Sequence, residues 1–265
     1  MFYFYTHEHS LFTTNNSKVN IKQYLDSTYL KTASQSGLSE NENEAVVKQF
    51  IQEAIDEEFK LIMVRPEMVS LAKKMIGDSN SVVQIGTVID FPEGNSSIEF
   101  KLQEADKAIL DGADDLDFVC NYEAFKRGET ALLKDEILKC TQLGLSNHKV
   151  VKWIIEVAAL NNQQIVQLCT LIKNCVISNF KEENFASVFV KSSTGFYKTE
   201  NDLPNGATIP VMIMMIENSF PLPVKAAGGV RTSEEAREML RLGVKRIGTS
   251  SAKAISIGGI SDNDY

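Results

Sequence analysis

Two lysines and an aspartate stand near the ends of otherwise apolar runs. The segments are Asp-Asp-Leu-Asp117-Phe-Val, Val-Phe-Val-Lys191-Ser-Ser-Thr-Gly and Pro-Val-Lys225-Ala-Ala-Gly-Gly. A lysine attacks a carbonyl only as the free amine, and an ordinary pKa of ~10.4 leaves little of that form at neutral pH. A second ammonium group within a few ångströms lowers this pKa. The three residues therefore predict Schiff-base chemistry at a carbon–carbon bond, with Asp117 moving protons.

Each lysine also has a simpler interpretation, because a lysine at a strand end can extend its amine to water. Small residues follow both lysines, however, and leave the space that a ligand at a reactive amine requires. These small residues are Ser192, Ser193, Ala226, Gly228 and Gly229. A fourth apolar run, Val-Lys152-Trp-Ile-Ile-Glu156, is also flanked by charged residues.

Two neighbouring strand-to-helix turns have the composition of a phosphate site. Gly228 and Gly229 precede Val-Arg-Thr and would let backbone N–H groups approach an anion closely. Ser250 and Ser251 follow Gly-Thr at the next turn, where a helix N-terminus could face a phosphate. The alternative is a pair of tight turns with an ordinary helix N-cap. The phosphate interpretation is favoured because barrels frequently bind phosphate at the loops after strands seven and eight.

The elements that must position these residues alternate along the chain. Strands are expected at about 22–26, 60–64, 82–89, 115–120, 150–155, 188–191, 223–227 and 245–248. Helical patterns are expected at about 41–57, 67–76, 97–112, 121–143, 162–177 and 208–218, near Thr232 and after the last strand. Strand–helix alternation predicts a parallel sheet, and eight such units predict an α/β fold of the (β/α)8 TIM-barrel type. We expect one barrel domain over 21–265, preceded by an arm over 1–20.

Composition excludes several other classes of protein. The net charge of −8 and the pI near 5.1 argue against nucleic acid as a partner. No apolar run is long enough for a membrane span, so no membrane partner is expected. Four cysteines without a Cys-x-x-Cys spacing, and three histidines, are too few for a disulfide scaffold and poor material for a metal site. Buried, reduced thiols and a cytoplasmic location are expected.

Seven segments, in order along the chain, resemble deoxyribose-phosphate aldolase. The most specific are Phe189-Val-Lys-Ser-Ser-Thr-Gly-Phe196 and Val224-Lys-Ala-Ala-Gly-Gly-Val-Arg-Thr232. The others are Leu25-Asp-Ser-Thr-Tyr-Leu30, Thr87-Val-Ile-Asp-Phe-Pro-Glu-Gly-Asn95, Gly112-Ala-Asp-Asp-Leu-Asp117, Val151-Lys-Trp-Ile-Ile-Glu156 and Arg246-Ile-Gly-Thr-Ser-Ser251. The resemblance implies a class I aldolase barrel. It would cleave 2-deoxy-D-ribose 5-phosphate reversibly to D-glyceraldehyde 3-phosphate and acetaldehyde without a metal or other cofactor, in deoxyribonucleotide catabolism.

The resemblance also implies roles for individual residues. Lys191 matches the Schiff-base nucleophile, Lys225 the second lysine, and Asp117 the aspartate that relays protons. The positions that match the family's phosphate site are Gly195, Gly228, Gly229, Ser250 and Ser251. Asp26 and Thr28 match a motif that borders the pocket floor, and Tyr265 matches a terminal tyrosine that assists protonation. A homodimer would be usual for the family.

Two segments depart from a minimal member of this family. The arm over 1–20 is additional, and the loop over 197–206, directly after the expected Schiff-base strand, is extended. Such a loop could alter access to the pocket. Two other functions stay open at this point: a Schiff-base barrel that acts on a different sugar phosphate, and a phosphosugar-binding module without turnover. The presence of paired lysines with an aspartate argues against the binding module, because binding alone does not need them.

Overall fold

Eight parallel strands form a closed barrel in the computed structural model, which describes residues 20–200 and 203–259. The strands are β1 (Leu25–Thr28), β2 (Leu61–Val64), β3 (Gln84–Ile89), β4 (Asp115–Val119), β5 (Val150–Ile154), β6 (Val188–Lys191), β7 (Val224–Ala227) and β8 (Arg246–Thr249). Each strand pairs with the next, and β8 pairs with β1. The expected (β/α)8 barrel is confirmed.

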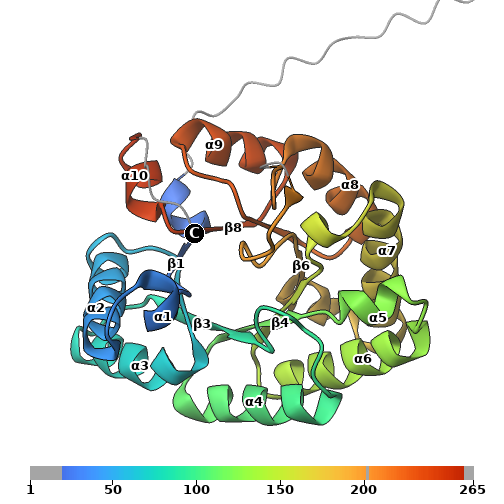
Figure 1. The fold of residues 1–265 in the computed structure, drawn as a ribbon, viewed down its shortest axis with the longest axis horizontal. Helices are drawn as coiled ribbons and strands as arrows, with labels where there is room; N and C mark the ends of the chain where they lie inside the picture. Colours follow the sequence, from blue (N-terminus) through green and yellow to red (C-terminus); the bar gives the residue numbers. More distant parts are fainter. Residues whose placement is uncertain (1–19, 201–202, 260–265) are drawn as a thin grey trace, which may run out of the picture.

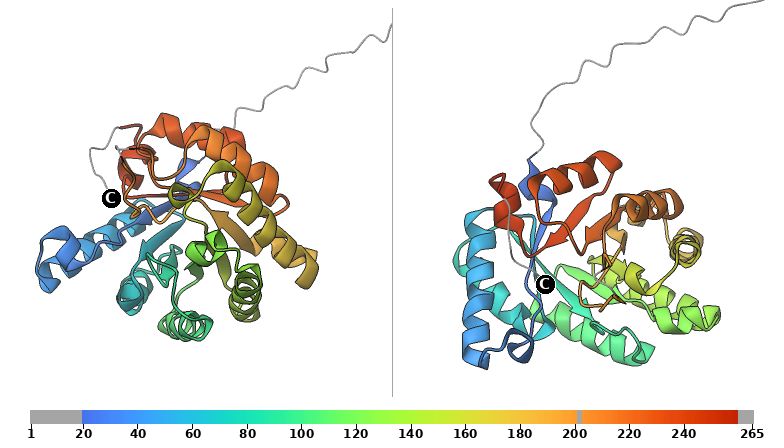
Figure 2. Two further views of the ribbon diagram at one scale, coloured as in Figure 1. Left: turned by 45° about the vertical axis from the view of Figure 1, so that its right-hand side comes forward. Right: turned by 45° about the horizontal axis from the view of Figure 1, so that its top comes forward.

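Helices surround the strands in all three ribbon views (Figures 1 and 2). The α-helices are α1 (Ala33–Ser36), α2 (Glu40–Asp56), α3 (Val69–Asp78), α4 (Ile98–Asp111), α5 (Tyr122–Lys126), α6 (Thr130–Ser146), α7 (Asn162–Asn179), α8 (Ile209–Ser219), α9 (Ser233–Leu242) and α10 (Ala252–Ser256). Short 3₁₀ helices are η1 (Ile21–Tyr24), η2 (Pro66–Met68), η3 (Val157–Ala159) and η4 (Glu182–Ser187). Among the helices of the described residues, none is long and apolar enough to cross a membrane.

Local sequence explains where several helices begin. Ser39 and Glu42 form a reciprocal capping box at the start of α2, and Thr232 and Glu235 form another at the start of α9. Such a box satisfies backbone N–H groups that have no partner within the helix. Helix α9 ends at Gly243, which adopts a left-handed conformation. The helix that connects β7 to β8 is therefore defined at both ends by local signals.

The main core lies between the outer faces of the strands and the helices. Trp153 of β5 stacks on Phe118 of β4 at 5.3 Å, and its Nε1 donates a hydrogen bond to Thr141 of α6. All four cysteines are free and buried, as expected. Burial raises the pKa of the Cys120 thiol, which therefore stays protonated at neutral pH. Cys120 belongs to this outer core, as do Leu116 and Phe118. Successive side chains along β4 alternate between this core and the barrel interior.

Three expectations from the sequence were wrong in detail. Residues 22–26 are not one extended piece: η1 comes first, and β1 continues past Asp26 to Thr28. The helical pattern after β4 is broken into α5 and α6, with Gly128 between them at a φ of 81°. The methionine-rich helix over 208–218 was expected to be buried, but Ile209 and Ile213 of α8 are exposed, although the helix is apolar on most sides. Periodicity alone does not reveal which side of such a helix meets a neighbour.

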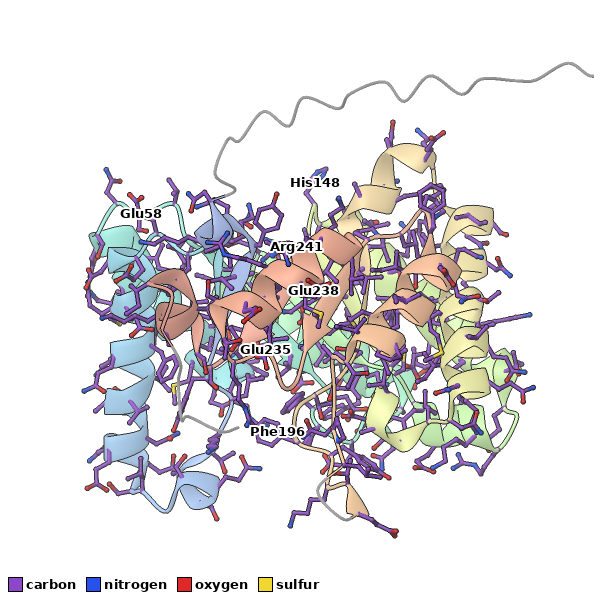
Figure 3. The ribbon with its side chains drawn as sticks, turned by 90° about the horizontal axis from the view of Figure 1, so that it is seen from above. Glu58, His148, Phe196, Glu235, Glu238 and Arg241 are labelled. Atoms are coloured by element: carbon purple, nitrogen blue, oxygen red, sulfur yellow. The ribbon has the colours of Figure 1, made fainter. Side chains whose placement is uncertain are left out.

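The two ends of the barrel differ in which strand termini they carry. Figure 3 shows Phe196, which follows β6, at the opposite end of the molecule from Glu58 and His148, which precede β2 and β5. The carboxyl ends of the parallel strands therefore lie on the side of Phe196. In barrels of this type, that end carries the active site.

Candidate active site

Asp117 accepts hydrogen bonds from three lysine side chains inside the barrel. Its Oδ2 atom accepts from Lys191 Nζ at 2.9 Å and from Lys225 Nζ at 3.0 Å. Its Oδ1 atom accepts from Lys152 Nζ at 2.7 Å. The Lys191 side chain is 4% exposed, and the other three side chains are fully buried. The structure thus brings the two lysines singled out from the sequence to one carboxylate oxygen.

Two further carboxylates and an arginine extend this cluster. Lys225 Nζ lies 2.6 Å from Asp26 Oδ2, and Arg246 approaches Asp26 Oδ1 through Nε at 2.7 Å and Nη2 at 2.6 Å. Lys152 Nζ lies 2.6 Å from Asp115 Oδ2, and Arg246 Nη2 lies 3.4 Å from the same oxygen. Three acidic and four basic side chains therefore form one buried charge network.

Within the described part of the chain, Lys191 differs from the other cations of the network. Lys152, Lys225 and Arg246 each contact two carboxylates, whereas Lys191 contacts Asp117 alone. Three carboxylates balance three cations, so the network is neutral when the Lys191 amine is unprotonated. Because an uncompensated charge in a buried site is costly, this arrangement favours loss of the proton from Lys191.

The pKa values of the two predicted lysines move in opposite directions. Burial lowers the pKa of Lys191 to about 8; Asp117 opposes this change, and the ammonium group of Lys225 adds to it. Burial acts on Lys225 too, but Asp117 and Asp26 outweigh it and raise the pKa of Lys225. Burial is also outweighed at Asp117, where the neighbouring ammonium groups hold the pKa well below its usual range. One lysine can therefore supply a free amine while the other stays charged.

The register of the strands explains why these side chains meet. Asp117 of β4 pairs with Lys152 of β5, and Lys191 of β6 pairs with Lys225 of β7. Gly248 of β8 leaves room for the Lys225 side chain, since a Cβ atom at that position would lie 3.0 Å from Lys225 Cε. The absence of a side chain on β8 thus allows the second lysine to reach the centre of the barrel.

Asp26 and Thr28 were predicted to border the floor of the site, and Tyr265 to assist protonation. Asp26 belongs to the charge network through Lys225 and Arg246. Thr28 is buried, and its hydroxyl donates a hydrogen bond to the Asp26 carbonyl oxygen at 2.8 Å. Tyr265 lies outside the described residues, as do residues 1–19 of the expected arm.

The three predicted glycines have backbone conformations that other residues rarely adopt. Gly195, Gly228 and Gly229 have φ angles of 82°, 82° and 87°. A Cβ atom on Gly229 would meet no described atom within 4 Å, so space is open above this turn. Thr249 Oγ1 donates to the Val230 carbonyl oxygen at 2.7 Å and joins the turns after β7 and β8.

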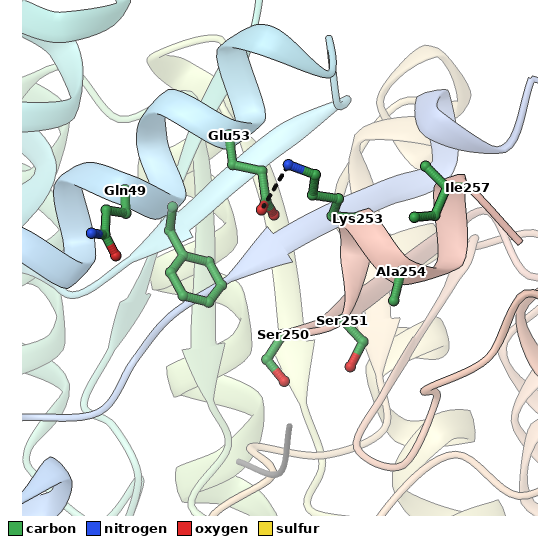
Figure 4. Close-up of a pocket in the computed structure, with 8 residues that line it drawn as sticks. Gln49, Glu53, Ser250, Ser251, Lys253, Ala254 and Ile257 are labelled. Atoms are coloured by element: carbon green, nitrogen blue, oxygen red, sulfur yellow. Dashed lines mark ion pairs between the residues drawn. The ribbon is translucent and has the colours of Figure 1, made fainter. Parts of the chain in front are cut away.

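Ser250 and Ser251 stand at the start of α10, where they help to line a pocket between α2 and α10 (Figure 4). On the other side of this pocket, Lys253 Nζ lies 3.9 Å from Glu53 Oε2. Ser251 is buried, and its Oγ atom has no hydrogen-bond partner in the part of the chain that the structure describes. An unpaired buried hydroxyl can serve as a donor to a ligand, because a buried polar group without a partner is costly.

Glu156 organises the turn that follows the predicted Schiff-base strand. Its Oε1 atom lies 2.8 Å from Ser193 Oγ, and its Oε2 atom accepts the Thr194 N–H at 3.1 Å and also contacts the Thr194 hydroxyl. Glu156 is buried at a φ of 52°, an uncommon value for a residue with a side chain. Burial raises its pKa in spite of these donors. The carboxylate thus fixes the backbone three residues after Lys191.

Sequence reasoning assigned no role to four members of this arrangement. They are Asp115, Lys152, Glu156 and Arg246. A signal existed for Asp115, because it lies two residues before Asp117 and must face the same side of β4. Arg246 is the first residue of its strand, where a side chain can extend to solvent. The sequence therefore did not indicate that Arg246 points into the barrel. Across residues 20–200 and 203–259, no group of three or more His, Cys, Asp and Glu side chains is arranged to hold a metal ion.

Comparison with known proteins agrees with this geometry. The family model described as DeoC/LacD family aldolase matches residues 31–260. Deoxyribose-phosphate aldolase of Thermococcus kodakarensis is 35% identical over 91% of this chain and 98% of its own length. The enzyme of the same name from Caldicellulosiruptor saccharolyticus is 32% identical over 90% of this chain and 98% of its own. The resemblance drawn from the motifs is confirmed.

Solved structures show the same fold. An aldolase named QR15 superposes with a TM-score of 0.74 at 29% identity, covering 90% of this chain and 95% of its own. A putative deoxyribose-phosphate aldolase from Coccidioides immitis gives 0.72 at 28% identity, with 90% and 85% covered. A tetrameric deoxyribose phosphate aldolase from Aeropyrum pernix gives 0.70 at 25% identity, with 89% of each chain covered. The chain is therefore an enzyme that belongs to the DeoC/LacD family of aldolases.

Proposed function

We propose that this aldolase cleaves 2-deoxy-D-ribose 5-phosphate reversibly to D-glyceraldehyde 3-phosphate and acetaldehyde, with Lys191 as the Schiff-base nucleophile. The observation that carries the proposal is the position of Lys191: its buried amine shares Asp117 Oδ2 with Lys225, and its pKa is lowered to about 8. The substrate is supported by the name of the relatives that match along nearly their whole length.

The neutral Lys191 amine attacks C1 of the open-chain substrate, and loss of water gives an imine. The bond between C2 and C3 then breaks as the C3 hydroxyl gives up its proton and becomes the aldehyde of glyceraldehyde 3-phosphate. The electron pair of the broken bond moves into an enamine between C1 and C2. Protonation at C2 and hydrolysis of the resulting imine release acetaldehyde and restore Lys191.

Lys225 and Asp117 are positioned to carry the protons of these steps. Both contact the oxygen that Lys191 contacts, so a proton that leaves the amine has an acceptor within hydrogen-bond distance. Because Lys225 keeps its proton through Asp26 and Asp117, it can act as the acid that protonates a leaving water or the enamine carbon. We include Tyr265 as a further candidate proton donor, and Asp26 and Thr28 as the floor of the site.

The phosphate of the substrate would bind at the turns after β6, β7 and β8. Gly228 and Gly229 supply backbone N–H groups in a positive-φ turn, and the buried Ser251 hydroxyl is available as a donor beside Ser250. Gly195 shapes the turn after β6, where its own N–H donates to Ser193 Oγ at 2.9 Å. Binding of this remote group would orient the reacting carbon, so that binding energy lowers the barrier for the chemical step.

The biological setting follows from the substrate. We place the reaction in the breakdown of deoxyribonucleotides and in the cytoplasm, where free, buried thiols such as the four cysteines persist. We also infer a homo-oligomer, with a dimer as the simplest form; the Aeropyrum pernix relative is a tetramer.

A coupled assay for glyceraldehyde 3-phosphate tests the proposed function. Lys191→Ala should abolish turnover while circular dichroism stays unchanged, and Lys181→Ala, at a side chain 82% exposed, serves as the matched control. Borohydride added with substrate should label wild type at Lys191 and leave the variant unlabelled. Turnover of a different sugar phosphate alone, or binding without product, would replace the proposed function by one of the two alternatives.

A further inference from the structure

The end of the extended loop after β6 lies between two turns of the proposed phosphate site. Asn205 Nδ2 donates to the Gly195 carbonyl oxygen at 3.3 Å, and Ser193 Oγ lies 2.6 Å from the Asn205 carbonyl oxygen. Two residues later, Ala207 N donates to the Gly228 carbonyl oxygen at 2.8 Å. Residues 205–207 therefore contact both the turn after β6 and the turn after β7.

Gly206 makes this contact so close that no side chain fits. A Cβ atom on Gly206 would lie 2.5 Å from the carbonyl oxygens of Ala227 and Gly228. A Cβ atom on Gly228 would lie 3.0 Å from Gly206 Cα and 3.4 Å from Ser193 Cβ. Three backbone segments that are distant in sequence thus meet at one point, and backbone atoms cannot move aside as the end of a flexible side chain can.

A second contact connects the same pair of turns close to the ends of β6 and β7. Ser192 Oγ donates to the Ala227 carbonyl oxygen at 2.8 Å and accepts the Ala227 N–H at 2.9 Å. With this contact, the turns after β6 and β7 are connected directly at residue 192 and through the loop at residues 205–207. The loop adds a connection at the outer end of the turns, beside Gly195 and Gly228.

We propose that residues 205–207 are a positioning element for the phosphate of the substrate. They hold the turn after β7 at a fixed place against the turn after β6, so that the N–H groups of Gly228 and Gly229 can face one anion. This inference rests on the proposed function for the identity of the phosphate ester. Its specific consequence is that the segment sets the preference for phosphorylated over unphosphorylated substrates, whereas the lysines alone determine whether imine chemistry occurs.

A change in this separation should affect anion binding strongly, because small displacements of positioning groups can cost up to ~100-fold in rate. Backbone N–H groups bind an anion only as a set that points at the same spot. The effect should be small on a substrate without phosphate, because Lys191, Lys225 and Asp117 lie on strands. Their ion pairs in the described part of the chain are with one another and with other residues of the charge network, not with residues 205–207.

Gly206→Ala tests the inference, with Gly77→Ala as the matched control. Both variants add one methyl group at a residue without a positive φ, but a Cβ atom on Gly77 of α3 meets no described atom within 4 Å. For Gly206→Ala we expect KM for 2-deoxyribose 5-phosphate and Kd for inorganic phosphate to rise roughly tenfold. kcat/KM for unphosphorylated 2-deoxyribose should stay within about twofold of wild type, and Gly77→Ala should match wild type throughout.

Calorimetric titration with inorganic phosphate separates this inference from the proposed function. If wild type binds phosphate but turns over neither sugar, the proposed function fails, and the ratio of the two Kd values still decides the inference. Equal phosphate affinity in Gly206→Ala and Gly77→Ala, or no phosphate binding in wild type, overturns the inference. Should Gly206→Ala not fold, Asn205→Ala removes the side-chain bond to Gly195 and should shift KM in the same direction; an unchanged KM there also overturns it.

Discussion

Lys191 and Lys225 share a single oxygen of Asp117, at 2.9 and 3.0 Å, yet their pKa values shift in opposite directions. The difference comes from the second carboxylate, Asp26, which lies 2.6 Å from Lys225 Nζ and does not contact Lys191. Both amines are buried, so burial acts against the charge of each. Lys225 has two acidic partners to offset it, and Lys191 has one. The nucleophile is thus distinguished from its neighbour by the number of acidic partners.

The first prediction concerns the pH dependence of imine formation. Only the unprotonated Lys191 amine attacks, so the rate of borohydride-trapped labelling with acetaldehyde should rise with pH through a midpoint near pH 8 and then level off. An ordinary lysine would place this midpoint near ~10.4. The rate of labelling, measured from pH 6 to 10 at constant ionic strength, gives the midpoint directly. A rise that continues past pH 10 would contradict the prediction.

The second prediction tests the influence of the neighbouring ammonium group. Lys225→Met removes a positive charge that lowers the pKa of Lys191, so the midpoint for labelling should move to higher pH. Turnover should also fall about 100-fold or more, because a proton donor is lost. The two effects are separable, since labelling measured at high pH depends on the amine alone. An unchanged midpoint would show that Lys225 does not influence the amine.

The sequence allowed the barrel to be predicted because strand and helix patterns alternate over most of its length. Asp117, Lys191 and Lys225 were recognisable because each interrupts an apolar run near its end. Asp115 was not assigned, although its spacing of two residues from Asp117 places both side chains on one face of β4. Arg246 stands at the first position of its strand, and its inward direction depends on how the closed barrel staggers its strands, which is a tertiary property.

The contacts of the loops were even less accessible to sequence reasoning. The Glu156 carboxylate contacts Ser193 and Thr194, and Glu156 itself has a positive φ. No glycine or turn motif at this position indicates that conformation. The extension over 197–206 was predicted to alter access to the pocket, which stays a prediction. The contact of its end with Gly228 was not predicted. Such contacts join segments that are distant in sequence, and no local periodicity or spacing reports them.

The third prediction concerns Glu156 as a residue that positions the turn after β6. Glu156→Ala removes the acceptor for the Thr194 N–H and hydroxyl and for the Ser193 hydroxyl, so this turn should lose its fixed geometry. We expect KM for the phosphorylated substrate to rise roughly tenfold, with a smaller change in kcat. Glu156→Gln keeps one acceptor oxygen and should recover part of the loss.

Steady-state kinetics on both variants, with Glu183→Ala at a side chain 73% exposed as the control, measure this effect. A merely structural role would lower the melting temperature without changing the ratio of KM values for phosphorylated and unphosphorylated substrate. That outcome, with KM unchanged in Glu156→Ala, would remove Glu156 from the set of positioning residues.

The last prediction concerns acid stability. The pKa of Asp117 lies well below its usual range in the folded protein, so its charge contributes stability that is present above the unfolded pKa of ~3.9. This stability is lost as pH falls from ~3.9 toward the folded pKa.

Asp117→Asn leaves Lys152, Lys191 and Lys225 with one acidic partner fewer at any pH, and removing one member of a buried ion pair costs roughly 3–5 kcal/mol. The gap in unfolding free energy between wild type and Asp117→Asn should therefore narrow as the pH falls below about 4. Urea unfolding of both proteins at each pH measures the gap. Carboxylates outside the charge network contribute equally to both unfolding free energies, so their contributions cancel in the difference. A gap that stays constant down to pH 3 would mean that the charge of Asp117 is not what the lysines stabilise.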